Sequence, residues 1–599
     1  MSVKMDKNTV IGVLLIILML ILVNTPFYKK TFFPQQYWQE QIRNSQRQAP
    51  AEVDSVLTPP PVEERSEAAP TVPPATIAAA AQRVEGEEVV VETPLFRLSF
   101  NTRGAVLTAC QMKHFKDPDS NFVQMLAGDS AGNLALGFTT ARDSVDTGLL
   151  LFRSDVNALS LGAGDSGSVT FIGDLGEGRQ IVKRYMFRGD SYYFGLDIRL
   201  ENFQNTIAQR RYTVGWRSGL APTEAKPLDD FQEAKVYALF AGNLEKFDIG
   251  RGPAKSGAMD GVVHWVGART KYFAAAIIPT SQRGVGMWYQ GRRQPPPRSF
   301  AIWDRHRLRE VDRLWKSYAF GLDMSFLNEP VREDRFLVFL GPLDYSTVRG
   351  PGVGLERMMS LGWKVIQPFS KAVLWCLKTL HRVIPNYGWV IVVFSLLVKV
   401  VLYPLTHSSL KSMHKMQELQ PRLVALREKY GKDPQRLNEE TMKLYKEAGV
   451  NPMGGCLPLL LQMPLLYALF VVFRNTISFR GQGFVFWIKD LANPDTVAVL
   501  PFSLPLYGNL VNILPLVMGV TMLIQQKMSV KDPKQKMMVY FMPIFFTLLF
   551  NSFPSGLNLY YMLFNVLSII QQKVVTDRLL VAKKEVAEKK PFLKRPRRR

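Results

Sequence analysis

Hydrophobic positions change their spacing along this chain of 599 residues. Between Glu88 and about Tyr345, apolar and polar residues alternate over short stretches separated by Gly, Asp and Asn. From Tyr192 to Leu200, for example, every second residue is apolar. Alternation with a period of two predicts half-buried strands. We therefore expect a large antiparallel, all-β sandwich domain over residues 88–347, long enough to bury its own core.

Continuous apolar runs replace this alternation near the C-terminus. They cover residues 388–406, 456–473, 511–526, 537–550 and 557–570. Such runs predict membrane spans, and together they predict an α-helical polytopic core over 387–575. The last two runs are short against a bilayer core of about 30 Å. We expect them to sit where the bilayer is thinned, or to form a shallow hairpin.

The N-terminus carries a further apolar run, Thr9–Val23, behind Lys4 and Lys7. Its length suits a signal-peptide core, but no clear small-residue cleavage site follows. We predict an uncleaved signal-anchor span over 1–28, with a cleaved signal peptide as the alternative. Residues 29–87, rich in Pro and Ala, are predicted to form a flexible linker.

Basic residues recur every seven positions after the β domain. They are Arg357, Lys364, Lys371 and Lys378. Trp and Leu lie between them, which is typical of a helix in the membrane interface. We predict an amphipathic helix over 356–384, bent at Pro368, within an interfacial segment 348–386. A soluble coiled-coil seam is the alternative.

The distribution of Lys and Arg predicts the orientation. The net charge is +23, and residues 408–450 hold nine basic residues, 527–536 hold four, and the tail after Gln571 holds eleven against three acids. The connections 474–510 and 551–556 hold three and none. Because basic loops face the cytoplasm, we predict six spans, both termini inside, and the β domain in the periplasm.

Segment 408–450 has helical spacing of its own. It predicts a cytoplasmic hairpin of Leu410–Lys429 and Pro434–Ala448, with Asp433 as an N-cap and Gly449 as a stop. A basic hairpin that only contacts anionic lipid headgroups is the alternative. The tail, 576–599, is also strongly basic.

A lysine lies inside the first of the five apolar runs. Lys399 is surrounded by Val and Leu, and none of the apolar segments contains Asp or Glu. An ionisable group at mid-span costs about 2.5–3.5 kcal/mol on insertion scales. This predicts a water-accessible, positively charged cavity, with snorkelling to the cytoplasmic interface as the alternative.

Other polar residues share this region of the predicted membrane. Ser395 lies one helical turn before Lys399, and the last run carries a polar stripe that ends at Ser568. The candidate groove residues are Lys399, Ser395, Gln462, Gln526, Asn558, Tyr561 and Asn565. Polar residues in spans are also used to join helices, which is the simpler interpretation.

Several kinds of chemistry are not indicated. Three cysteines and six histidines have no metal-ligand spacing, and we find no phosphate-binding glycine loop, so we expect no metal, no cofactor and no ATP-driven step. Four tryptophans of the β domain would suit either a sugar groove or the core: Trp216, Trp265, Trp288 and Trp303. A tethered carbohydrate enzyme would need a carboxylate pair that the sequence cannot assign.

Several short motifs resemble the YidC family of membrane protein insertases. They are Tyr403-Pro404-Leu405-Thr406, Leu419-Gln420-Pro421, Asn451-Pro452-Met453-Gly454-Gly455-Cys456-Leu457-Pro458, Gln462-Met463-Pro464 and Phe553-Pro554-Ser555-Gly556-Leu557. The anchor and the β domain, with Asn101-Thr102-Arg103-Gly104, resemble the Gram-negative form.

The resemblance implies a non-enzymatic insertase and chaperone of the inner membrane, acting alone or with the Sec translocon. It implies a groove open to cytosol and lipid and closed to the outside, with Ser395, Gln462 and Tyr561 at groove positions. Lys399 matches the groove arginine of the family, which keeps the charge but loses the bidentate fork. Implied partners are nascent membrane proteins, anionic lipids, and the ribosome and signal-recognition machinery at the basic hairpin and tail. A solute transporter or channel remains the alternative.

Overall fold

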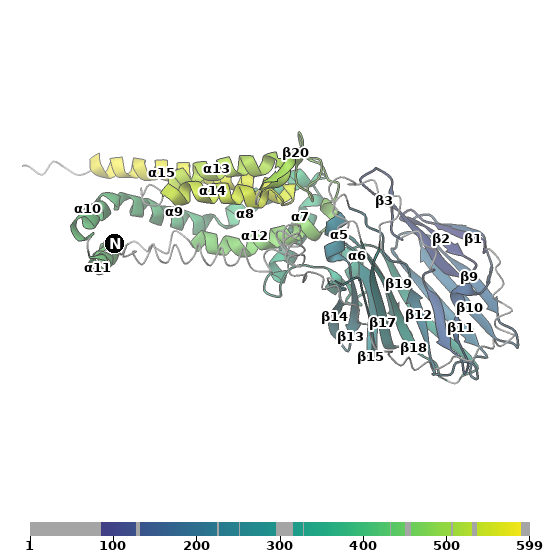
Figure 1. The fold of residues 1–599 in the computed structure, drawn as a ribbon. Helices are drawn as coiled ribbons and strands as arrows, with labels where there is room; N and C mark the ends of the chain where they lie inside the picture. The colour runs from purple at the N-terminus through teal and green to yellow at the C-terminus, as the bar shows by residue number, and fades with distance from the viewer. Residues whose placement is uncertain are drawn as a thin grey trace, which may run out of the picture. The chain divides into compact units, whose positions relative to one another are not determined.

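The computed structural model describes most of the chain after residue 85. The described ranges are residues 86–126, 132–224, 227–250, 252–294, 315–327, 329–431, 433–449, 457–504, 507–529 and 536–588. The predicted anchor, 1–28, lies outside them, and so does the linker except for its last two residues. The described residues form a β unit that ends at Met359 and a helical unit that begins at Ser360 (Figure 1).

The β unit contains a smaller and a larger sheet. The smaller has the order β4 (Phe122–Gln124), β3 (Val106–Lys116), β2 (Phe96–Asn101), β1 (Glu88–Glu92) and β8 (Ala158–Ser160). The larger has the order β6 (Ser144–Asp146), β5 (Ala135–Thr139), β12 (Arg211–Trp216), β18 (Trp315–Ser325), β17 (Gly284–Gln294), β15 (Ala254–Arg269), β16 (Phe273–Pro279), β19 (Val331–Pro342), β11 (Tyr193–Glu201), β10 (Gln180–Arg188), β9 (Ser166–Asp174) and β7 (Arg153–Ser154). β13 (Lys235–Phe240) pairs with β15 and with β14 (Asn243–Phe247).

Aromatic side chains fill the space between the two sheets. The Phe100 ring of β2 lies 4.6 Å from the Tyr185 ring of β10 and 6.1 Å from the Phe171 ring of β9, centroid to centroid. The alternation predicted for β11 is also present, since Phe194 through Leu200 are buried at every second position. The two sheets therefore pack face to face, in agreement with the predicted sandwich.

The segment predicted as one interfacial helix is divided. α6 (Tyr345–Arg349) and the 3₁₀ turn η5 (Leu355–Met358) belong to the β unit, and α7 spans only Gln367–His381. The single helix over 356–384 is therefore wrong, and Pro368 lies in the first turn of α7 instead of bending a longer helix. The reason is local: Gly362 has a φ of +89°, and proline suits the first helical turn because it lacks an N–H.

The helical unit continues from α7 to the C-terminus. Its elements are α8 (Tyr387–Val401), α9 (Tyr403–Glu418), α10 (Gln420–Tyr430), α11 (Pro434–Glu447), α12 (Leu457–Asn475), β20 (Thr496–Leu504), β21 (Gly508–Asn512), α13 (Ile513–Ser529), α14 (Lys536–Phe550) and α15 (Ser555–Glu588). The sequence predicted no element for most of the β20–β21 hairpin, but β21 takes the first two residues of the run predicted as a span over 511–526, so the helix begins only at Ile513.

Two prolines divide segments that were predicted to be continuous. The helix expected over 388–406 ends at Val401, and α9 begins with Pro404 in its first turn. Pro421 likewise separates α9 from α10 inside the predicted Leu410–Lys429 helix. A proline inside a helix removes a backbone hydrogen bond and clashes with the preceding turn, so a new helix starts at each one. The predicted cap is confirmed, since the Asp433 carboxylate accepts from two backbone N–H groups of α11.

The last helix is much longer than the apolar run that predicted it. The run covers 557–570, whereas α15 has 34 residues and continues into the basic tail as far as Glu588. Residues 571–588 contain neither Gly nor Pro and are rich in good helix formers. The sequence therefore predicted a last helix that is much shorter than α15.

Judged by length and hydropathy alone, none of the helices in the described ranges would suffice individually to cross a membrane. Tyr387–Val401 and Thr406–Glu418, which are bent by 65° to one another, would suffice as a pair.

Candidate functional site

The predicted groove residues are contributed by four helices. Ser395 and Lys399 lie on α8, Gln462 on α12, Gln526 on α13, and Asn558, Tyr561 and Asn565 on α15. α15 packs against α8, α12 and α13, so most of these side chains come from neighbouring helices.

Lys399 is held by a neutral hydroxyl and an aromatic ring. Its ammonium donates a hydrogen bond of 2.7 Å to the Ser568 hydroxyl and lies 4.4 Å from the centre of the Phe564 ring. The residue is 8% exposed, and among the described residues its ammonium contacts only this hydroxyl and ring and forms no ion pair. The site therefore holds a buried positive charge whose partners carry no negative charge.

Ser395 lies one turn before Lys399, as predicted, and is buried. Its hydroxyl donates to the Ile391 carbonyl at 2.7 Å, within its own helix. This bond satisfies the donor and leaves the hydroxyl oxygen available as an acceptor. Ser395 therefore adds an acceptor next to the charge without neutralising it.

Tyr561 and Gln462 face each other between α15 and α12. The amide of Gln462 lies near the Tyr561 hydroxyl, which has no well-aligned hydrogen bond to any described residue. The Tyr561 ring packs edge-on against Phe550, 5.4 Å between centroids. Gln526 is half-buried near the end of α13.

Two asparagines of the predicted stripe join structural elements. The Asn558 amide donates to the carbonyls of Phe550 and Phe553, at 3.2 and 3.4 Å, and so secures the turn between α14 and α15. The Asn565 amide donates to the Thr521 hydroxyl of α13 at 3.4 Å. For these two residues the contacts are those of interhelical joints.

The polar face of α15 extends further than the sequence prediction. The Gln571 amide donates to the Thr406 hydroxyl of α9 at 3.0 Å, and the Ser529 hydroxyl donates to Gln572 at 3.2 Å. The spacing signal was present, because Gln572 follows Ser568 by four residues. The predicted stripe stops at the end of the apolar run, whereas the helix continues to Glu588.

The other end of α15 is bonded to the connection that leads from α12 to α13. The Ser555 hydroxyl donates to the Asp490 carbonyl at 2.6 Å, and the Gly556 N–H donates to the Leu491 carbonyl at 3.0 Å. Asn551, just before α15, donates to the carbonyls of Tyr507 and Leu510, both at 2.8 Å. These hydrogen bonds close this end of the helical unit.

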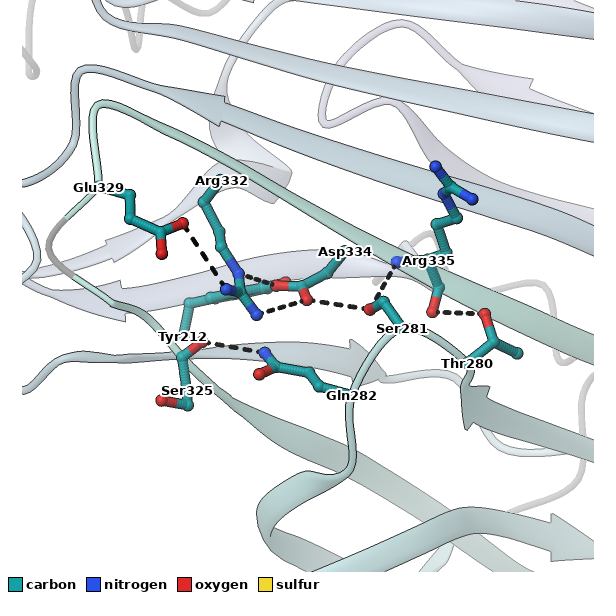
Figure 2. Close-up of polar contacts among 9 residues, drawn as sticks. All are labelled: Tyr212, Thr280, Ser281, Gln282, Ser325, Glu329, Arg332, Asp334 and Arg335. Carbon is teal, nitrogen blue, oxygen red and sulfur yellow. Dashed lines mark hydrogen bonds and ion pairs between the residues drawn. The ribbon is translucent and has the colours of Figure 1, made fainter.

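The β unit contains a buried polar cluster of its own, centred on Asp334 (Figure 2). Arg332 donates two hydrogen bonds of 2.9 Å to the carboxylate, one to each oxygen. The Tyr212 hydroxyl donates at 2.7 Å and the Ser281 hydroxyl at 3.0 Å. The carboxylate is fully satisfied, so the cluster joins strands and leaves no acceptor for a ligand.

The Tyr212–Asp334 contact reveals the curvature of the larger sheet. Tyr212 lies on β12 and Asp334 on β19, five strand spacings apart in the sheet order. Along a flat sheet that separation is about 24 Å. A direct hydrogen bond across it requires the sheet to curl strongly toward one side.

A buried lysine links the two sheets. The Lys183 ammonium donates to the carbonyls of Gly104, Ala105 and Leu134, at 2.8, 3.3 and 2.9 Å. Burial lowers the pKa of this ammonium to about 7. The alternation of buried and exposed residues along β10 marks Lys183 as an inward-facing residue, because it lies between the buried Ile181 and Tyr185.

The other proposed chemistry of the β unit finds little support. Trp216 and Trp265 are fully buried in the core, Trp288 is half-buried, and Trp303 lies outside the described residues. The core interpretation therefore holds for the first two. Across the described residues, no group of three His, Cys, Asp or Glu side chains is arranged to hold a metal ion.

Comparison with known proteins identifies the family. A family model described as the YidC periplasmic domain matches residues 88–375, and one described as the 60Kd inner membrane protein matches 379–583. The membrane protein insertase YidC of Chlorobium luteolum is 35% identical over 578 residues, covering 95% of this chain and 94% of the relative. The chain belongs to the YidC family of membrane protein insertases.

Two further similarities concern YidC proteins. The insertase of Chlorobaculum tepidum is 34% identical over 97% of this chain and 96% of its own length. A solved structure, described as an active YidC insertase with its first transmembrane domain resolved, is 18% identical and covers 84% of this chain and 96% of that chain, with a TM-score of 0.34. The two matched family models adjoin within α7.

Proposed function

We propose that this YidC-family chain inserts nascent membrane proteins by using Lys399 to attract the hydrophilic segment that must cross the membrane. The observation that carries the proposal is the buried ammonium with a hydroxyl and a ring as its partners. A charge-assisted bond to a carboxylate is stronger than one to a neutral hydroxyl. An acidic segment would therefore displace Ser568 from Lys399.

The remaining polar side chains would extend this attraction into a path. Ser395, Gln462, Tyr561 and, nearer the cytoplasm, Gln526 supply acceptors and donors around the charge. Each hydrogen bond that they offer lowers the cost of moving a polar backbone out of water. The apolar span of the substrate would then leave sideways into lipid, without covalent chemistry.

The proposed topology has six spans, with the first over residues 1–28 and five in the helical unit. Exposed apolar side chains on the outer faces of α13 and α14, such as Leu516, Val520 and Ile544, support contact with lipid. The counts of basic residues support a cytoplasmic location for α9–α11, the tail and both termini, and a periplasmic β domain. α7 would lie in the interface, since Trp375 is 70% exposed while Leu374 and Leu377 are buried.

The proposed partners follow from the charge of the cytoplasmic elements. Exposed cations such as Arg422 and Lys443 on α10 and α11, together with the basic tail, would contact the ribosome, the signal-recognition machinery or anionic lipids. Cooperation with the Sec translocon is part of the same proposal.

The solute-transporter alternative has less support. It needs a pathway open at both faces. The hydrogen bonds of Asn551, Ser555 and Gly556 join elements at the end where such a pathway would have to open. A groove with one closed end fits insertion better than transport.

Photocrosslinking tests the path. A benzoylphenylalanine at Tyr561 is exposed to ribosome-bound nascent chains with stalled first spans, and a matched probe replaces Ile570, an exposed residue of the same helix. We expect crosslinks at Tyr561 that depend on nascent-chain length, and weaker ones at Ile570. A folded, ribosome-bound insertase without crosslinks at Tyr561 would contradict the proposal.

Charge reversal tests the electrostatic step. Lys399→Glu should lower the insertion of substrates with acidic translocated segments about tenfold or more, which corresponds to about 1.4 kcal/mol. Substrates with neutral segments should change little. Lys371→Glu, at an exposed site on α7, is the control. Normal insertion of acidic substrates by Lys399→Glu would refute the electrostatic step.

A further inference from the structure

The β20–β21 hairpin exposes apolar side chains on both of its faces. Val497, Val499, Phe502 and Leu504 of β20 are all exposed, although valine, phenylalanine and leucine are normally buried. Residues 496–512 include no charged side chain. A strand with no polar face is a poor fit to water, so its exposed surface indicates a partner.

The base of the hairpin is firmly attached to the helical unit. The buried Asp495 carboxylate accepts from the backbone N–H groups of Ile513 and Leu514, at 3.0 and 2.7 Å, and so caps α13. Asn512 donates to the backbone carbonyl and the side chain of Asn551. Asn551 in turn holds the carbonyls of Tyr507 and Leu510, at 2.8 Å each. The hairpin therefore projects from a fixed base.

Another apolar side chain, that of Phe486, projects from the same connection. Phe486 is 90% exposed and has a φ of +59°, a conformation that residues with a side chain rarely adopt. The next residue, Trp487, is anchored, because its indole N–H donates to the Asp495 carboxylate at 2.9 Å. Backbone strain of this kind persists where the surroundings enforce it, and here it presents an aromatic ring to the outside.

The chemistry of this surface favours lipid as the partner. Within the part of the chain that the structure describes, β20 pairs with β21 alone, so its other edge has no strand partner there, and the hydrocarbon core does not tolerate such an edge. The interface between headgroups and acyl chains accepts both apolar side chains and hydrated backbone. α13 follows β21 directly and exposes Leu516, Val517 and Val520 in its first turns, and β20 lies at this end of α13 (Figure 1).

We propose that the β20–β21 hairpin and Phe486 lie in the membrane–water interface, at the end of the helical unit where α12 connects to α13, and that they bind lipid there. In this position the hairpin holds that end of the helices at a fixed depth. Residues 496–526 contain no charged side chain, so no charge interrupts the chain where it passes from the interface into α13.

Photocrosslinking with lipid as the sole partner tests this inference. Benzoylphenylalanine replaces Phe502 in one full-length variant and Phe486 in another, and the purified protein is reconstituted in vesicles of phosphatidylcholine and phosphatidylglycerol. The matched control carries the probe at Lys489, an exposed polar residue of the same connection. After illumination, mass spectrometry of the intact protein and its peptides identifies each adduct.

We expect lipid adducts at positions 502 and 486 at a yield about tenfold above that at 489. A covalent second copy of the chain as the main adduct would overturn the proposal in favour of a protein interface. So would equal lipid yields at all three positions. Addition of ribosome-bound nascent chains completes the test, because a nascent chain that replaces lipid as the main adduct at 502 would identify β20 as a substrate-binding edge and would also refute lipid as its partner.

Discussion

The Lys399 ammonium and the Ser568 hydroxyl join α8 to α15 through a hydrogen bond of 2.7 Å. The same hydroxyl donates to the Phe564 carbonyl, also at 2.7 Å, so it meets the lysine as an acceptor. The ring of Phe564 covers the ammonium from another side. A buried cation with only neutral partners is poised to exchange one of them for a carboxylate, which is the step that the proposed function requires.

Substitution of Ser568 tests whether the free charge of Lys399 matters. Ser568→Asp places a competing carboxylate within reach of the ammonium, and a close ion pair of this kind resists separation in a poorly hydrated site. We expect insertion of substrates with acidic segments to fall about as far as in Lys399→Met. Protease accessibility of the translocated segment in reconstituted vesicles measures this.

The neutral counterpart, Ser568→Asn, is the matched control, because it has the size of aspartate and leaves the charge of Lys399 uncompensated. Its insertion of the same substrates should stay close to that of the unmodified protein. Equal activity of the Asp and Asn variants would show that the charge of Lys399 does not attract the substrate.

Asp334 and its partners should stabilise the curled sheet of the β unit. Asp334→Asn leaves the Arg332 guanidinium, largely buried, with only the longer pair to Glu329 at 3.8 Å, and should lower the free energy of unfolding by about 3 kcal/mol. Tyr212→Phe removes one hydrogen bond to a charged group and should cost about 2 kcal/mol. Hydrogen exchange of peptides from β12 and β19 in the full-length protein reports both changes.

Arg335 supplies the control for this cluster. Its side chain is exposed and pairs with an exposed Glu333 at 3.4 Å, so Arg335→Gln should change stability by less than about 0.5 kcal/mol. If Asp334→Asn has an effect as small as that of Arg335→Gln, the cluster does not hold the sheet together.

Lys183 should make the stability of the β unit depend on pH above neutrality. Its pKa is about 7 in the folded protein and about 10.4 in an unfolded chain. Between these values the unfolded state binds one more proton than the folded state. The free energy of unfolding should therefore rise with pH, by about 1.4 kcal/mol per pH unit, and level off below pH 7.

The Lys183→Met variant isolates this dependence. It removes the titrating group, and it also leaves three carbonyls unpaired, so it should be less stable at every pH. The informative quantity is the difference in unfolding free energy between the two proteins, from urea titrations at pH 7 to 10. We expect it to grow with pH, and a constant difference would exclude Lys183 as the titrating group.

The sequence predicts the classes of element well because period and charge are local properties. Strands such as β11 and the cap at Asp433 follow from residues close together in the chain. The breaks at Pro404 and Pro421 are also local, since each proline lies in the first turn of a new helix, but the apolar run 388–406 and the helical spacing of 410–429 both continue across them. The length of α15 was missed because its apolar run ends before the helix does.

Contacts between residues that are far apart in the sequence are harder to predict from it. Lys399 was recognised as unusual, but its pairing with Ser568 depends on how α8 and α15 are aligned, which spacing along one helix does not determine. Asn558 shares the stripe of Tyr561 and yet faces a turn. The β20–β21 hairpin resembles the start of a span, because apolar residues without charges suit a helix and a strand equally.

Gly519 permits close packing of α13 against α14, which provides a last prediction. A Cβ at this position would lie 2.0 Å from the Thr547 hydroxyl of α14, and small residues allow helices to approach closely in membranes. Gly519→Ala should therefore push the helices apart, lower the melting temperature of the detergent-solubilised protein and speed hydrogen exchange in α14. Thr547→Ala removes the obstructing hydroxyl, so the double variant should recover most of the loss.

A double-mutant cycle measures the coupling between Gly519→Ala and Thr547→Ala, which we expect to exceed about 1 kcal/mol. Additive effects of the two substitutions would show that this contact does not limit the approach of α13 to α14.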